Sequence, residues 1–265
     1  MPVQVWATWF PRDGKPQSFI QGFSVEDLEL SARGQTPFHF RHRGNVIEEN
    51  CCRGALQVDG HTVSWDLNYR STFRVILSDK GWIGFSRTPH SDAQFSGQIV
   101  LDGRSSTGDP LAYGVQGHNC GYRHRSFWTW AHAYFPRPGA PATTLEALIY
   151  DMPLGLVFRR AVLWHEGRPH VFRKLQENNR NAGQFAWNFR CCSRDGLQLE
   201  AAFDGAGPSL HRLPYLKTNC SGSFEVTNNS LARAWVQLER GLGQLGGTPT
   251  HLETTTGAVL EMVGR

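Results

Sequence analysis

Polar side chains capable of directional bonding gather between residues 117 and 124, directly before a run of aromatic residues. They are His118, Asn119, Arg123 and His124. An imidazole in a glycine-flanked turn can be aimed at a substrate, and it can move a proton once a neighbour fixes its tautomer. We therefore predict a catalytic role for His118, with Asn119 and His124 binding the substrate. The alternative for Asn119 is that it only closes the turn, the usual task of an Asn side chain there.

The residues that follow alternate in a way that predicts a strand with two apolar faces. Read with a period of two, one face carries four large rings, Trp128, Trp130, His132 and Tyr134. The other face carries small and aromatic residues that suit a core, namely Phe127, Thr129, Ala131, Ala133 and Phe135. Large amphipathic rings line sites for apolar ligands, so we predict that the first face binds substrate. The alternative is a strand packed on both faces within a core that holds no ligand.

Two carboxylic acids are candidate partners of the histidine in proton transfer. Asp66 lies on the polar face of a strand whose other face is apolar, and Asp151 follows Ile149 and Tyr150. Hydration or cyclisation of an alkene needs a proton donor, a dry cavity and stabilisation of a developing cation, which aromatic faces supply. We therefore assign catalytic roles to Asp66 and Asp151. The alternatives are a solvent-facing strand residue for Asp66 and a turn-initiating residue for Asp151.

Composition indicates a globular chain that acts on small molecules. Of 265 residues, 40% are hydrophobic and 19% are charged, and the formal net charge of +4 is too small to imply a nucleic-acid partner. No stretch reaches the roughly 18 to 20 apolar residues of a membrane span, although peripheral membrane contact is compatible with the sequence. No signal peptide is evident and the six cysteines lack metal-site spacing, so we expect reduced thiols in a cytoplasmic protein.

Strand and hairpin signals recur along the chain, and helical periodicity is nearly absent. The clearest hairpin turns at Asp59 and Gly60, a strong type I′ signal that would pair Val58 with His61. Trp65 then lies on the apolar face of the second strand, and we assign it to substrate binding. Similar turns are expected at residues 102–103, 166–167, 195–196 and 228–229. Only residues 24–30 could form a helical turn, and the alternative for them is a strand.

Short strands at this spacing predict an all-β sandwich or barrel. The Pro- and Gly-rich segment 136–141 resembles a surface loop or a hinge. We therefore expect two β subdomains, residues 1–135 and 136–265.

Several short segments match one known group in order along the chain. They include Gly117-His-Asn-Cys-Gly121, Trp128-Thr-Trp130 and Gly257-Ala-Val-Leu-Glu261, with further pieces at 54–67 and 96–99. Together they resemble the lipocalin-like superfamily of tocopherol cyclases, carotenoid 1,2-hydratases (hydroxyneurosporene synthases) and β-barrel Diels–Alderases. Cys120 stands where those relatives usually carry Trp. The resemblance implies two lipocalin-like antiparallel β-barrel or sandwich subdomains packed together, and chemistry on apolar molecules without a redox cofactor.

These observations predict a cofactor-independent enzyme that holds an apolar, isoprenoid or polyketide-like molecule in an aromatic-lined pocket. It would promote cyclisation, isomerisation or hydration by proton transfer, as an intramolecular lyase or a hydro-lyase. No metal is expected, because His118, His124 and His132 lack the spacing of metal ligands. The alternative is a non-catalytic lipocalin-like carrier of a hydrophobic metabolite.

Overall fold

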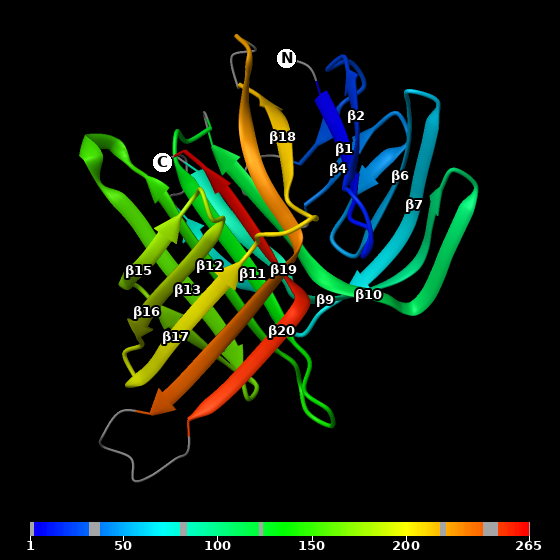
Figure 1. Cartoon of the computed structure of the whole chain (residues 1–265). Helices are drawn as coiled ribbons and strands as arrows, with labels where there is room; N and C mark the ends of the chain where they lie inside the picture. The colour runs from blue at the N-terminus through cyan, green and yellow to red at the C-terminus, as the bar shows by residue number, and fades with distance from the viewer. Residues whose placement is uncertain are drawn as a thin grey trace. The chain divides into compact units, whose positions relative to one another are not determined.

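The computed structural model describes residues 3–31, 38–79, 84–121, 124–217, 221–240 and 249–264. In these residues the chain is antiparallel β structure, and its one helical segment is a single 3-10 turn, η1 (Pro153–Gly155). The all-β prediction is confirmed (Figure 1). The chain forms two compact units, Met1–Trp9 with Pro16–Tyr122, and Phe10–Lys15 with Arg123–Arg265.

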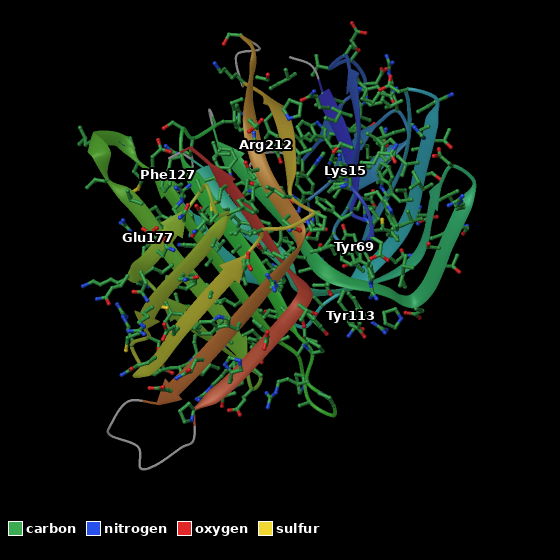
Figure 2. The ribbon with its side chains drawn as sticks, in the orientation of Figure 1. Lys15, Tyr69, Tyr113, Phe127, Glu177 and Arg212 are labelled. Carbon is green, nitrogen blue, oxygen red and sulfur yellow. The ribbon has the colours of Figure 1, made fainter. Side chains whose placement is uncertain are left out.

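The first unit contains an eight-stranded sheet in the order β10-β9-β7-β6-β5-β4-β3, with β8 paired to β9. Its strands are β3 (Glu29–Leu30), β4 (Phe40–His42), β5 (Asn45–Ile47), β6 (Cys51–Val58), β7 (His61–Arg70), β8 (Val75–Asp79), β9 (Gly84–Leu101) and β10 (Arg104–Gly121). A separate hairpin, β1 (Val3–Trp9) with β2 (Gln17–Phe23), packs Phe19 against Leu56 and Val63 of the sheet. Figure 2 shows the side chains of this unit, with Tyr69 and Tyr113 labelled.

The β6–β7 hairpin has the predicted register. Val58 pairs with His61 across a turn in which Asp59 and Gly60 both have positive φ, 52° and 80°. Only a primed turn accommodates two such residues, and its twist matches that of the strands. The turns expected at 102–103, 166–167 and 195–196 also lie between paired strands. Turn chemistry was therefore sufficient to place these four hairpins.

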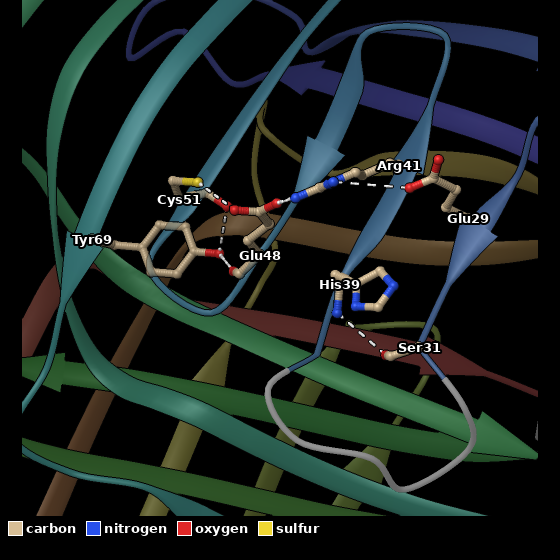
Figure 3. Close-up of polar contacts among 7 residues, drawn as sticks. All are labelled: Glu29, Ser31, His39, Arg41, Glu48, Cys51 and Tyr69. Atoms are coloured by element: carbon tan, nitrogen blue, oxygen red, sulfur yellow. Dashed lines mark hydrogen bonds and ion pairs between the residues drawn. The ribbon is translucent and has the colours of Figure 1, made fainter.

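A polar network ties the short strands at one edge of the first sheet to its centre (Figure 3). The Tyr69 hydroxyl donates to the backbone carbonyls of Glu48 and Cys51, the second at 3.0 Å. Arg41 forms an ion pair with the Glu48 carboxylate and lies 3.9 Å from that of Glu29. Burial raises the pKa of Tyr69, so the phenol remains a hydrogen-bond donor at neutral pH.

The second unit is built on a ten-stranded sheet in the order β14-β13-β12-β11-β20-β19-β17-β16-β15, with β18 paired to β19. Its strands are β11 (Trp128–Phe135), β12 (Thr143–Asp151), β13 (Val157–His165), β14 (Arg168–Phe172), β15 (Leu175–Asn181), β16 (Ala186–Cys192), β17 (Leu197–Asp204), β18 (His211–Leu216), β19 (Ser223–Arg240) and β20 (Thr250–Val263). Both ends of the sheet contribute to one core, and an Arg159–Glu177 ion pair of 3.2 Å joins β13 to β15. The sheet therefore curls into a barrel.

Aromatic side chains fill the inside of this barrel. Trp187, Phe189 and Phe203 are fully buried, and the ring centroids of Trp187 and Phe189 lie 4.7 Å apart. On β11 the inward residues are the small and aromatic set predicted for a core, including Ala131 and Phe135. The alternation read from the sequence is confirmed on that strand. It leaves the large rings Trp128, Trp130, His132 and Tyr134 on the opposite face.

Two local expectations were wrong, and a third is met only by its alternative. Residues 228–229 do not form a turn, because β19 runs through them and its irregularity is a bulge between Asn229 and Ala232. The Asn229 side chain serves that bulge, donating to the Gly205 carbonyl and accepting from the Leu231 N–H, each at 2.8 Å. Residues 117–121 continue β10 as a paired strand instead of forming a turn. Residues 24–30 contain a bend, a turn and the short strand β3, so the strand alternative holds for their last two residues.

The unit boundary lies before β11, whereas the sequence placed it after this strand. β11 pairs with β12 on one side and β20 on the other, so it belongs to the second sheet. The Pro- and Gly-rich segment 136–141 joins β11 to β12 inside that unit. A search of the described residues found no helix with the length and apolar character needed to cross a bilayer.

We expect Phe203→Ala to lower the free energy of unfolding of the second unit by about 3–5 kcal/mol, since it opens a cavity in the barrel core. Gln198→Ala, on the exposed face of the same strand, is the matched control and should change it by less than about 0.5 kcal/mol. Denaturant unfolding followed by tryptophan fluorescence measures both. Equal effects of the two variants would contradict the described packing.

Candidate active site

The outward face of β11 carries two tryptophans, and each donates a hydrogen bond to a carboxylate on a neighbouring strand. The Trp128 Nε1–H donates to Glu261 Oε1 of β20 at 2.7 Å. The Trp130 Nε1–H donates to Glu146 Oε1 of β12 at 2.9 Å. Glu261 pairs with Trp130 in the β11–β20 register and Glu146 with His132 in the β11–β12 register, so all five side chains share this face. The Trp128 side chain therefore reaches toward β20, and the Trp130 side chain reaches toward β12 on the other side of β11.

Within the second unit, a chain of aromatic rings extends from Trp128, which donates a hydrogen bond to Glu261. Phe224 of β19 meets the Trp128 ring edge-on, with centroids 5.8 Å apart at 84°. Tyr215 of β18 lies 5.8 Å from Phe224, and His124 lies 5.1 Å from the same ring. The second Glu261 oxygen accepts from Asn228 Nδ2 at 3.4 Å. We call Trp128, Tyr215, Phe224, Asn228 and Glu261 the Glu261 cluster.

The environment of Glu261 favours its protonated form. Burial raises its pKa above the ordinary value of 4.5, and the hydrogen bonds from Trp128 and Asn228 offset only part of that rise. Both donors are neutral, so neither supplies the positive charge that would hold the group ionised. Burial and the nearby Glu261 carboxyl likewise raise the pKa of Tyr215. A neutral carboxyl group in an aromatic setting is the arrangement that general-acid catalysis requires.

The second indole–carboxyl pair is more deeply buried. Glu146 is 2% exposed, as is His132, its partner across the β11–β12 ladder. Tyr134, one step further along the same face, is partly buried. The four predicted ring residues therefore do share one face, and that face carries two carboxyl groups.

Asp151 braces the chain where it enters β11. Its carboxylate accepts from the Ser126 hydroxyl at 3.0 Å and from the Phe127 N–H at 3.1 Å. These bonds fix the residues immediately before Trp128. These contacts agree with the structural alternative for Asp151. Its effect on the Glu261 cluster is indirect, through the backbone of the residues that precede Trp128.

His118 lies in the first unit, on β10. Gln116 Nε2 lies 2.6 Å from its Nε2, and the Phe38 ring is 3.8 Å away between centroids. Burial, with a smaller contribution from His90, lowers the pKa of His118 to about 4. The imidazole is therefore neutral at pH 7, with one ring nitrogen as a hydrogen-bond donor and the other as an acceptor. Asn119, its neighbour, is exposed.

Asp66 and Trp65 also belong to the first unit. Asp66 is exposed and forms a 2.8 Å ion pair with Arg53. It pairs with Gln98 of β9, whereas His118 pairs with Arg87 of the same strand, so their partners are separated by roughly 36 Å of strand, at about 3.3 Å per residue. The register therefore does not bring Asp66 and His118 together. Trp65 packs against the Phe19 cluster and over Gly54, where any side chain would collide with its ring.

The second unit therefore gathers His124, Trp128, Trp130, His132 and Tyr134 on or beside one sheet face, while His118, Asn119, Trp65 and Asp66 belong to the other unit. Sequence reasoning missed Glu146 and Glu261. The signal was present, because each is a lone carboxylate in an otherwise apolar strand segment. A search of the described residues found no group of three or more His, Cys, Asp or Glu side chains placed to hold a metal ion.

The fold defines the class of protein: the described chain is an all-β protein built from antiparallel sheets. Among solved structures it is similar to the crystal structure of kievitone hydratase from Nectria haematococca, with a TM-score of 0.54 and 12% sequence identity. The similarity covers 94% of this chain and 75% of that one. No protein-family model and no curated protein sequence matches the chain. At this identity the similarity concerns the fold.

We expect the His118 ring to titrate with a midpoint near pH 4, well below 6.5. Between these values the unfolded chain binds a proton that the folded chain does not, so stability should fall as the pH drops through this window. Nitrogen-detected NMR titration gives the midpoint, and His118→Gln should flatten this part of the stability profile. A midpoint near 6.5 would contradict the described burial.

Proposed function

We propose that this protein is a hydro-lyase that adds water to, or removes it from, an apolar small molecule at the Glu261 cluster. The observation that carries the proposal is the carboxyl group of Glu261, whose pKa is raised by burial and whose two hydrogen-bond donors, Trp128 and Asn228, are neutral. The fold supports the reaction class, since the similar solved structure is that of a hydratase. Substrates of isoprenoid or polyketide type fit a face built from large rings.

The chemistry can proceed with protons and water alone. Neutral Glu261 donates its proton to one carbon of an alkene, whose π electrons form the new C–H bond and leave a cation on the other carbon. The ring faces of Trp128 and Phe224 stabilise that charge. Water adds to the cation, and the Glu261 carboxylate takes the proton that the water releases, which restores the acid. No electrons are gained or lost overall, so the reaction needs no redox cofactor.

The two hydrogen bonds to Glu261 act mainly in the transition state. A neutral carboxyl accepts weakly from Trp128 and Asn228, whereas the carboxylate that forms on proton transfer accepts strongly. Interactions that strengthen as charge develops lower the barrier without tightening ground-state binding. The same cation could instead be captured by an internal alkene, which would give cyclisation, or lose a proton elsewhere, which would give isomerisation.

We expect Glu261→Gln to reduce hydration of apolar alkenes at least about 100-fold, because the amide cannot donate an acidic proton. In the wild-type protein the rate should fall as the pH rises through the raised pKa of Glu261, which removes the proton to be donated. Mass spectrometry detects the gain of one water, and oxygen-18 water identifies its source.

The matched control is Glu225→Gln on β19. That carboxylate is exposed and lies 3.5 Å from Arg212, so its loss should leave the rate unchanged. Equal turnover of the Glu261→Gln and wild-type proteins would remove the proposed role of Glu261. Ligand quenching of tryptophan fluorescence without any product would instead identify a carrier of a hydrophobic metabolite.

A further inference from the structure

The loop between β12 and β13 presents leucine side chains directly to solvent. Leu154 is 97% exposed and Leu156 is 58% exposed. They flank Gly155 in the five-residue connection that contains η1. Isolated exposed apolar residues need no explanation, but a nearly uncovered leucine at a loop tip, two residues from another, forms an apolar projection.

The loop holds this projection in a fixed and costly conformation. The Met152 N–H donates to the Leu156 carbonyl at 2.8 Å, which closes the connection at its base. Leu154 has a φ of 64° and Gly155 a φ of 73°. A β-carbon makes the left-handed region unfavourable, so leucine is a poor choice there for the backbone. A strained residue with no packing contacts to recover that cost suggests a function for its side chain outside the fold.

Basic side chains line a depression that reaches the first residue of β13, directly after Leu156. β13 begins at Val157, which lines an open depression together with Leu175 of β15. The charged residues of that depression are Arg159, Arg173, Lys174 and Glu177, of which Figure 2 labels Glu177. Glu177 is paired with Arg159, so the positive charges of Arg173 and Lys174 are not balanced within the depression.

Arg160, on the other face of β13, adds to the positive charge of this region. It packs over the Phe158 ring at 5.3 Å, and burial followed by the charge of Arg173 lowers its pKa. The region thus repels further cations and attracts anions.

We propose that this end of the second unit docks on an anionic lipid surface. Leu154 and Leu156 enter the boundary between headgroups and acyl chains, and Arg173 and Lys174 contact lipid phosphates. A convex tip carrying only two leucines fits a soft interface, whereas a protein partner would need a larger area. Neither element suffices alone, since stable interfacial binding takes an apolar and an electrostatic contribution together. The proposal is independent of the role of Glu261.

The test is flotation of the full chain with phosphatidylcholine vesicles, with and without phosphatidylserine. We expect binding to the anionic vesicles that weakens as salt is added, and little binding to phosphatidylcholine alone. Leu154→Asp should weaken binding about tenfold or more, and it should fold normally because aspartate tolerates a positive φ. Arg173→Gln with Lys174→Gln should weaken it roughly twentyfold.

Matched variants separate this surface from general effects. Ile76→Asp alters an equally apolar side chain that is 50% exposed on β8, and Arg212→Gln with Arg233→Gln removes two charges on β18 and β19. Both should bind as the wild type does. Binding that is absent, or lowered equally by the control and test variants, would overturn the proposal. So would concentration-dependent self-association abolished by Leu154→Asp, which would assign the tip to a second copy of this chain.

Discussion

A carboxyl group removed from water must be compensated or protonated, and the Glu261 cluster depends on that constraint. Trp128 and Asn228 provide two hydrogen bonds to Glu261 but no positive charge. These bonds compensate only part of the loss of hydration, so burial is the larger effect and the pKa of Glu261 is raised. A cationic partner at either position would hold the group ionised and end its use as an acid. Burial thus raises the pKa of Glu261, while the hydrogen bond from Trp128 opposes part of that rise.

The barrel core is what holds these groups in place. β11 presents Ala131 and Phe135 to the core and its indoles to the opposite face, so packing on one side fixes the ring positions on the other. Asp151 secures the residues before Trp128. The small inward residues of β11 leave room for large rings from other strands in the same core, which a close-packed interior requires. The active face is therefore rigid because its reverse face is the core.

Local patterns predicted much of this fold. Turn residues with positive φ placed the hairpin at Asp59, and a period of two assigned the faces of β11. The turn predicted at residues 228–229 was wrong because asparagine is also common in β-bulges. Only the long-range pairing with β20 distinguishes the bulge from a turn. Glu261 was missed because its hydrogen bond spans 133 residues of sequence. Contacts between residues so far apart in the sequence produce no recognisable local motif. A lone carboxylate in an apolar strand does, however, mark a group that needs a partner.

The pKa of Glu261 tests the account most directly. Carbon-13 NMR of the glutamate side-chain carboxyls, with the Glu261 signal assigned by its loss in Glu261→Gln, gives the titration midpoint in the intact protein. The account predicts a midpoint above 4.5, and a further rise in Trp128→Phe, which removes a hydrogen bond that favours the ionised form. A midpoint low enough to leave Glu261 ionised at neutral pH would contradict its role as the acid.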